Sequence, residues 1–220
     1  GLPGVLALCE HEVAGVRAAG HALLQGALDA LVAEPGPLFV LAESAWEDTR
    51  RLAFGIIKER LDLGAYGPEQ RLEALIGLCD SNRPDVQAFG REMVLRWFRE
   101  VDPREVMARL AEHPGRGMKR FALDLIEDHL PAGAEALGRV SAFFSTILLD
   151  VRPDRRLKRQ AVAFLLARGR LDYEQARVAA QVLDGWVRTC VRADRERALE
   201  ALALLTLDFP DLQTSVEVRA

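Results

Sequence analysis

The sequence predicts an all-α protein built from about six stacked helix pairs, a right-handed α-solenoid, and three observations lead to this fold class. One pattern recurs along the 220 residues: an apolar residue, a small residue or Cys, an acid, a short break, and then an apolar stripe at helical spacing. The copies begin 32 to 39 residues apart, which accommodates two helices and two turns. Half of the residues are apolar and only 6% are aromatic, and the many Ala and Leu residues favour helix over strand.

The pattern places the repeats in order along the chain. Five copies begin at Leu8, Leu41, Leu78, Leu110 and Leu149. The fifth copy carries one extra residue, and a degraded sixth copy starts near Val191. We therefore expect one continuous domain with repeats near 1–33, 34–66, 67–101, 102–130, 131–169 and 170–209, followed by a tail at 210–220. Residues 212–218 alternate weakly after Pro210, so we expect them to be extended and to pack on the repeats or pair with another chain.

The third repeat shows most clearly why each copy forms two helices. Gly67-Pro68-Glu69 opens a first helix, whose apolar residues at helical spacing are Leu72, Leu75, Ile76 and Cys79. The polar run Asp80-Ser81-Asn82 ends this helix. A second helix begins at Pro84, because proline suits the first turn and Asp85 favours the positive helix end. Its apolar stripe comprises Val86, Phe89, Met93 and Trp97.

A residue without bulk recurs in the second helix of the repeats. It is Gly20, Ala53, Gly90, Ala122 and Ala203, with Ala161 near the equivalent place in the fifth repeat. Glycine inside a helix is about 1 kcal/mol less favourable than alanine, so its use at two equivalent positions indicates a steric requirement. We expect the neighbouring helix to approach closely at this point.

The order of acid, break, apolar residue and basic residue resembles that of HEAT repeats over nearly the whole chain. The resemblance implies that an acid in the turn of each repeat faces a basic residue of an adjacent repeat. The turn acids are Glu10, Glu43, Asp80, Glu112 and Asp150. The basic position holds Arg17, Arg50, Gln87, Lys119 and Lys158, so the row is interrupted at Gln87. The stretches S-x-W-E-D-x-R from Ser44 and C-D-S-N-R-P-D-V-Q-A-F-G from Cys79 also look like repeats of large, multidomain bacterial HEAT-repeat proteins, which implies binding more than catalysis.

The composition and the N-terminal sequence indicate the cellular location of the chain. It has no uncharged apolar run of about 18 residues, and its N-terminus lacks the basic and apolar stretches of a secretion signal, so we expect a soluble cytoplasmic protein. The start at Gly1 without Met, and the apolar opening up to Leu8, suggest a piece of a longer chain. Three cysteines are too few for a disulfide framework, and Cys9 and Cys79 share a repeat position that is Ala in other copies, so we expect both in the core.

The motifs give no sign of catalysis, a metal or a cofactor. Cys9-Glu10-His11-Glu12 are neighbours in sequence and do not converge on one ion, and the other histidines are dispersed. The chain contains no HExxH, nucleophile elbow, phosphate-binding glycine loop or dinucleotide fingerprint. We therefore expect no catalytic residue, no metal site and no cofactor.

The most prominent exposed feature that we expect is basic. The net charge is −4, but residues 1–110 hold 12 basic and 17 acidic residues, whereas 111–220 hold 17 and 16. The two basic clusters are Arg152, Arg155, Arg156 and Arg159 at one helix start, and Arg116, Lys119 and Arg120 one repeat earlier. Stacked repeats would place them side by side, to meet phosphates or an acidic protein surface. The alternative is a solvated helix face in which Lys119 and Lys158 serve the row of charges.

A catalytic alternative comes from DNA glycosylases of the alkylpurine-repair type, which also use HEAT-like helix pairs, with aromatic residues and an acid on a basic face. Three tryptophans are candidates for such aromatic residues. Trp97 continues the apolar stripe of its helix and Trp186 follows Val182 and Leu183 at helical spacing, so we expect both in the core. Trp46 stands in a turn, where it serves either as an exposed binding anchor or as a staple against the helix start.

These observations predict a non-catalytic scaffold that binds a macromolecular partner. The first choice of partner is another protein, bound along the surface made by the second helices of the repeats. The second choice is nucleic acid, bound through the two basic clusters, and a glycosylase-like enzyme comes third. The expected binding residues are Arg116, Lys119, Arg120, Arg152, Arg155, Arg156, Arg159 and Trp46.

Overall fold

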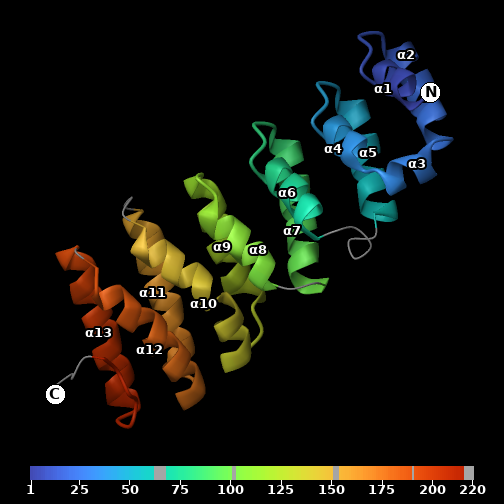
Figure 1. Ribbon diagram of the computed structural model, residues 1–220. Helices are drawn as coiled ribbons and strands as arrows, with labels where there is room; N and C mark the ends of the chain where they lie inside the picture. Colours follow the sequence, from blue (N-terminus) through green and yellow to red (C-terminus); the bar gives the residue numbers. More distant parts are fainter. Residues whose placement is uncertain (62–67, 101–102, 151–153, 190, 216–220) are drawn as a thin grey trace. The chain divides into compact units, whose positions relative to one another are not determined.

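The computed structural model describes residues 1–61, 68–100, 103–150, 154–189 and 191–215, and these residues form thirteen α-helices and no strand (Figure 1). By their contacts, the residues divide into two compact parts. We call them the N-terminal half, Gly1–Val101, and the C-terminal half, Asp102–Ala220. Each half forms its own pair of helix layers.

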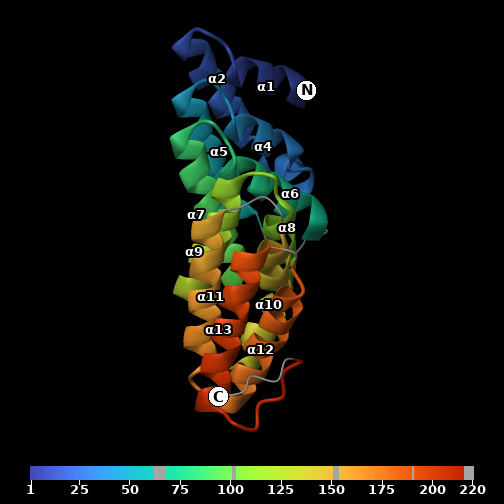
Figure 2. The same cartoon turned by 90° about the vertical axis from the view of Figure 1, so that its left-hand side faces the viewer.

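The N-terminal half contains three helix pairs and one additional helix. Its helices are α1 (Leu2–Cys9), α2 (Ala14–Gln25), α3 (Leu28–Ala33), α4 (Gly36–Ala42), α5 (Glu47–Arg60), α6 (Pro68–Cys79) and α7 (Pro84–Glu100). The first helices α1, α4 and α6 contact one another in sequence, and so do the second helices α2, α5 and α7. Figure 2 shows these two layers within the half, with α2, α5 and α7 on the left. The second helices therefore present a surface of their own.

The C-terminal half repeats this arrangement with three further pairs. Its helices are α8 (Pro103–Glu112), α9 (Arg116–His129), α10 (Ala134–Leu149), α11 (Arg155–Gly169), α12 (Tyr173–Val187) and α13 (Arg192–Asp208). The second helices α9, α11 and α13 are neighbours, with α11 in contact with both of the others. After α13 the chain returns to the helices: Leu212 is buried, and the Ser215 amide donates a hydrogen bond to Asp184 Oδ2 at 2.8 Å.

The all-α fold class and the series of helix pairs are confirmed. The described residues contain the six predicted pairs, and the helix starts at Pro68 and Pro84 agree with the third repeat. The six-residue helix α3 is an addition that the pattern did not predict. The single continuous domain and the right-handed turn of the array remain predictions.

Apolar stripes of the paired helices form the core. In the third repeat, Leu72, Leu75, Val86 and Trp97 are fully buried, as their helical spacing predicts. Helix α10 is buried along one broad face, through Leu137, Val140, Phe143, Phe144, Ile147 and Leu148, whereas its opposite face is exposed. Cys79 is also fully buried, and this burial raises the pKa of its thiol to about 12. Cys79 therefore serves as a small core residue, as its repeat position predicts.

Two glycines mark the places where a second helix touches the end of its first helix. A Cβ atom at Gly90 would lie 2.6 Å from the Cys79 nitrogen, and one at Gly20 would lie 2.7 Å from the Cys9 nitrogen. Real Cβ atoms do not approach backbone atoms so closely, so the predicted steric requirement is confirmed at both glycines. Repeats with Gly at this position carry Cys in the first helix, whereas the second and fourth repeats carry Ala at both.

The small residue of the sixth repeat is Ala198 and not Ala203. Ala198 lies seven residues after Val191, the N-cap of α13, and Gly20 likewise lies seven residues after Val13, the N-cap of α2. Ala198 is fully buried, whereas Ala203 is half-buried. The prediction placed this position too late because the start of the degraded repeat is not marked by Pro or Gly.

We expect Gly90→Ala to lower the free energy of unfolding by about 1 to 3 kcal/mol, because its methyl group must displace the backbone of Leu78 and Cys79. Gly77→Ala, in the first helix of the same repeat, is the matched control. No atom lies within 4 Å of a Cβ there, so alanine raises the unfolding free energy by up to about 1 kcal/mol. Denaturant unfolding followed by circular dichroism measures both, and equal effects would refute the close approach.

Candidate binding surfaces

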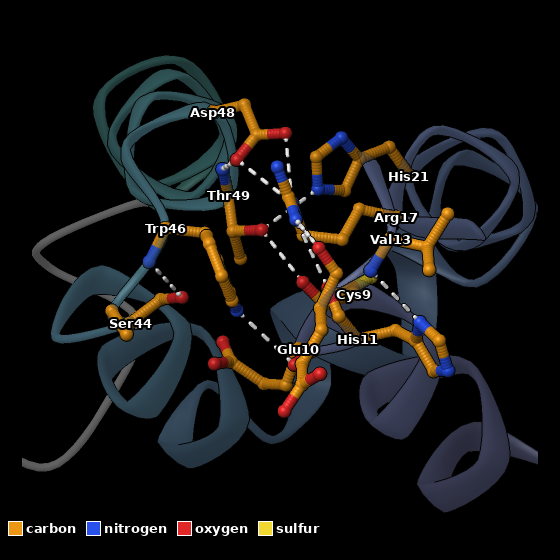
Figure 3. Close-up of polar contacts among 12 residues, drawn as sticks. Cys9, Glu10, His11, Val13, Arg17, His21, Ser44, Trp46, Asp48 and Thr49 are labelled. Carbon is orange, nitrogen blue, oxygen red and sulfur yellow. Dashed lines mark hydrogen bonds and ion pairs between the residues drawn. The ribbon is translucent and has the colours of Figure 1, made fainter. Parts of the chain in front are cut away.

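A buried arginine joins the first two repeats of the N-terminal half (Figure 3). Arg17 Nε donates to both carboxylate oxygens of Asp48, at 3.1 and 2.9 Å. Its second nitrogen, Nη1, donates to the carbonyls of His11 and Glu12, each at 3.0 Å. The side chain is only 9% exposed. One guanidinium thus closes the turn before its own helix and binds the first turn of the next second helix.

Trp46 packs against this arginine. The guanidinium carbon of Arg17 lies 4.2 Å from the centroid of the indole ring, which is a cation–π contact. The indole nitrogen donates to the Glu10 carbonyl at 3.2 Å, and the backbone amide of Trp46 donates to Ser44 Oγ at 3.1 Å (Figure 3). Trp46 is half-buried and forms the N-cap of α5. These contacts explain a tryptophan in the turn without a partner molecule, and its role as a binding anchor remains a prediction.

A hydrogen-bonded chain runs beside the arginine. The Thr49 hydroxyl donates to the Cys9 carbonyl at 2.7 Å, and His21 Nε2 lies 2.9 Å from the same hydroxyl oxygen. Since the single hydroxyl proton of Thr49 is used on Cys9, His21 Nε2 must donate. Thr49 is fully buried, so this chain also links the first repeat to the second.

The second repeat contains an equivalent buried arginine, Arg50. Arg50 Nε donates to Asp85 Oδ2 at 2.7 Å, and its Nη1 donates to the carbonyls of Ser44 and Ala45 at 3.0 and 3.1 Å. The Arg50 side chain is 10% exposed, whereas that of Asp85 is 41% exposed. The buried partner in the pair is therefore the cation, and its three acceptors compensate for the lost water.

These contacts lower the pKa values of the two aspartates, Asp48 and Asp85. Partial desolvation acts to raise the pKa of Asp48, but the hydrogen bond and charge of Arg17 outweigh it, so the pKa lies below its usual value. The same balance, with Arg50 as the partner, lowers the pKa of Asp85. Both carboxylates are thus held in the ionised form that the buried arginines need.

Lysines take the same position in the C-terminal half. Lys119 Nζ donates to Asp150 at 2.7 Å, and Lys158 Nζ donates to Asp194 at 2.8 Å. Lys158 and Asp194 are 6% and 9% exposed, so this is the most deeply buried of the ion pairs among the described residues. Lys119 is only 14% exposed and is paired, so it belongs to the row of inter-repeat pairs and not to a free basic surface.

The acids of these pairs differ from those that the HEAT resemblance implies. Among the predicted turn acids, Asp150 alone binds the basic position within the described part of the chain. The observed partners of the other three cations are Asp48, Asp85 and Asp194, in the first turn of the next second helix. Glu43 accepts a hydrogen bond from Ser81 at 2.9 Å instead. In these three repeats the cation binds the acid in the first turn of the next second helix, and not the acid of the turn.

The predicted basic residues gather at the N-terminal ends of α9, α11 and α13. We call this group the basic edge and define it as the exposed residues Arg116, Arg120, Arg155, Arg156, Arg159, Arg192 and Arg195. Arg192 and Arg195 were missed by sequence reasoning, although they occupy the same helix turn in the sixth repeat. Arg152 lies outside the described residues. The two clusters were predicted to lie side by side, and the helices that carry them, α9 and α11, are in contact.

Asp154 is the acid within this edge. It is the N-cap of α11, and its Oδ1 accepts hydrogen bonds from the amides of Arg156 and Leu157 at 3.2 and 3.0 Å. Arg120 binds its other oxygen at 3.3 Å. The Leu157 amide in particular holds the pKa of Asp154 below its usual value. Because Asp154 is only 18% exposed, it caps the helix and offers little negative charge to the surface.

An apolar groove lies on the second helices of the N-terminal half. The rings of Phe54 and Phe89 stack with their centroids 4.1 Å apart, and the small residues Gly55 and Ala88 leave space beside them. The space measures about 470 Å³ and is bordered by the ion pair of Lys58 and Glu92. We call it the α5–α7 groove. Phe89 is 7% exposed, so its assignment to the core is confirmed, but sequence reasoning missed the groove beside it.

A second hollow, of about 460 Å³, lies in the C-terminal half between the α8–α9 turn, the end of α10 and the start of α11. Its lining includes Lys119, Asp150 and Lys158, which are already engaged in inter-repeat pairs. We assign no ligand to it.

Several expectations concern other kinds of site. Trp97 and Trp186 are 0% and 1% exposed, so their assignment to the core is confirmed and neither is available to stack on a base. Within the described ranges, no three His, Cys, Asp or Glu side chains lie close enough together to hold a metal ion. None of the described helices is long and apolar enough to cross a membrane.

Comparison with known proteins identifies no family for the chain. No family model matches the chain, and no curated protein does either. Among solved structures, a designed armadillo repeat protein is similar over 93% of this chain and 100% of its own, with 15% identity and a TM-score of 0.40. The assignment of function therefore depends on the surfaces described above.

We expect Arg50→Ala to lower the free energy of unfolding by about 2 to 4 kcal/mol, because it leaves two turn carbonyls and Asp85 without their donor. Arg51→Ala is the matched control. Arg51 is 75% exposed and pairs only with Glu47 one turn away, so its loss changes the value by less than about 0.5 kcal/mol. Denaturant unfolding of the two variants tests this, and similar small losses would contradict a structural role for Arg50.

Proposed function

We propose that the chain is a non-catalytic scaffold whose second helices bind another protein, with the α5–α7 groove as the docking point. The observation that carries the proposal is the half-buried Phe54, stacked on Phe89 beside an open apolar space. Aromatic residues in a pocket with a polar border are typical of the residues that dominate protein interfaces. An apolar side chain of the partner would fill the space.

The use of the ionisable groups supports a scaffold over an enzyme. Arg17 and Arg50 each bind a carboxylate and two carbonyls, and Lys158 binds Asp194 in the core. These are the most buried charges described, and each is satisfied by a neighbouring repeat. We therefore propose structural roles for them and assign no catalytic residue.

The finer classification follows the same reasoning. We infer repeats of HEAT type, like those of bacterial multidomain proteins, because four of the five predicted positions in the second helices carry a cation, Gln87 being the exception. We also infer a cytoplasmic setting, because Cys9 and Cys79 are free, buried thiols suited to a reducing compartment.

The test of the groove is Ala88→Arg, which places a charge in it without removing any packing side chain. Ala88 is exposed, and Arg occurs at the equivalent position in α5 and α9, as Arg51 and Arg120, so the helix accommodates the change. Ala108→Arg, on an exposed position of the first helix α8, is the control. Immobilised chains are incubated with a lysate of the source cells, and retained proteins are quantified by mass spectrometry.

We expect a partner that the original chain and Ala108→Arg retain equally, and that Ala88→Arg retains at least about tenfold less, as for a charge introduced into a hot spot. Equal retention by Ala88→Arg would exclude the groove as the docking point. Retention lost in both variants would indicate a general charge effect and would also refute the proposal.

A further inference from the structure

We propose that the basic edge of the C-terminal half binds the sugar–phosphate backbone of a nucleic acid. This inference goes beyond the scaffold function, because it concerns a second surface and a second class of partner. It rests on the charges of α9, α11 and α13 and does not depend on the α5–α7 groove.

The charge of the edge is largely uncompensated. Among the described residues, Arg155, Arg156 and Arg195 form no ion pair, and the guanidinium of Arg159 donates only to the Arg155 carbonyl. The carboxylates near the arginines are those of Glu112, which lines a hollow with Arg116, Asp124, which accepts from Gln160, Asp154, which caps α11, and Glu196, which pairs with Arg192. Asp150 and Asp194 are bound by the inter-repeat lysines. The seven arginines therefore outnumber these four carboxylates.

The arginines also occupy positions where a helix disfavours them. The N-terminus of a helix carries a partial positive charge, so acids stabilise the first turn and cations destabilise it. The second helices α5 and α7 follow this rule, with Glu47 and Asp48 at the start of α5 and Asp85 at the start of α7. At the same two positions, α11 carries Arg155 and Arg156 and no acid in its first turn. A destabilising arrangement at the surface is best explained by a binding role.

Overall composition does not explain this contrast. Arginine outnumbers lysine 26 to 3 over the whole chain, so a preference for Arg over Lys is general. Such a preference replaces one cation by another. It does not replace an acid by a cation at equivalent positions of two repeats, which is the difference between α5 and α11.

The spacing of the edge suits a regular polyanion. The helices α9, α11 and α13 lie next to one another in the second layer of the half (Figure 2). Packed helices are about 8 to 10 Å apart, and residues one turn apart, such as Arg155 and Arg159, are separated by about 6 Å along the axis. The result is a two-dimensional set of guanidinium groups, each able to bind a phosphate through two parallel hydrogen bonds. An acidic protein surface would be expected to require an apolar centre as well.

The test is fluorescence anisotropy with labelled 20-nucleotide single-stranded DNA and a duplex of equal length, from 50 to 200 mM salt. The probe variant is Arg155→Glu with Arg156→Glu. Acids at these two positions favour the start of α11, so the variant is expected to fold. The control is Arg139→Glu with Arg177→Glu, on α10 and α12 of the first layer, which changes the net charge equally.

We expect the original chain to bind DNA with an affinity that falls steeply with salt, as for several released counterions. The probe variant is expected to bind at least tenfold more weakly, and the control within about twofold of the original. No binding at 50 mM salt would overturn the proposal, and so would equal losses in both variants, because net charge alone would then account for binding.

Competition separates nucleic acid from other polyanions. Poly-glutamate represents an acidic protein segment, and vesicles with 30% phosphatidylserine represent a membrane surface. Each competitor is compared with unlabelled DNA at an equal concentration of negative charge. If poly-glutamate or the vesicles displace the labelled DNA as effectively as unlabelled DNA does, the assignment to nucleic acid is wrong. Ala88→Arg should leave DNA binding unchanged, so failure of this proposal is distinguishable from failure of the groove.

Discussion

A largely buried cation at the fourth residue of the second helix holds successive repeats together. Arg17, Arg50, Lys119 and Lys158 occupy this position, and each binds a carboxylate of the next repeat. A charge removed from water destabilises a fold by several kcal/mol unless it is fully paired. The cation is therefore acceptable only when the next repeat is stacked in register. In the N-terminal half the arginine also fastens the preceding turn, which fixes where the second helix begins.

This constraint divides the charged residues of the chain into two groups. Those inside the layers, such as Arg50 and Lys158, are satisfied by protein groups and serve the fold. Those at the helix starts of the C-terminal half, such as Arg155 and Arg156, form no ion pair among the described residues, and we propose that they bind a ligand. The apolar residues divide in the same way, because Trp97 is enclosed whereas Phe54 borders an open groove. The functional proposals come from the second group in each case.

The periodic features of the fold follow from the sequence, and the features that depend on local geometry do not. Helical spacing predicts the six pairs and the buried side of each helix, and glycine inside a helix predicts the close contact at Gly90. The partner of Arg50 could not be read in this way, because Asp80 and Asp85 are both acids beside the turn of the next repeat, and only the shape of the turn decides between them. The groove was missed for a similar reason: Phe54 is apolar, and its exposure depends on the small residue at Ala88.

The most direct test of the stacking interaction is a double-mutant cycle of Arg50→Ala and Asp85→Asn, with each free energy of unfolding measured in denaturant. If the pair joins the second repeat to the third, the cycle should give a coupling energy of at least about 1 kcal/mol. Arg50→Ala should also be the more destabilising single change, because only this change removes the hydrogen-bond donor of the two turn carbonyls. A coupling energy within about 0.3 kcal/mol of zero would contradict the account.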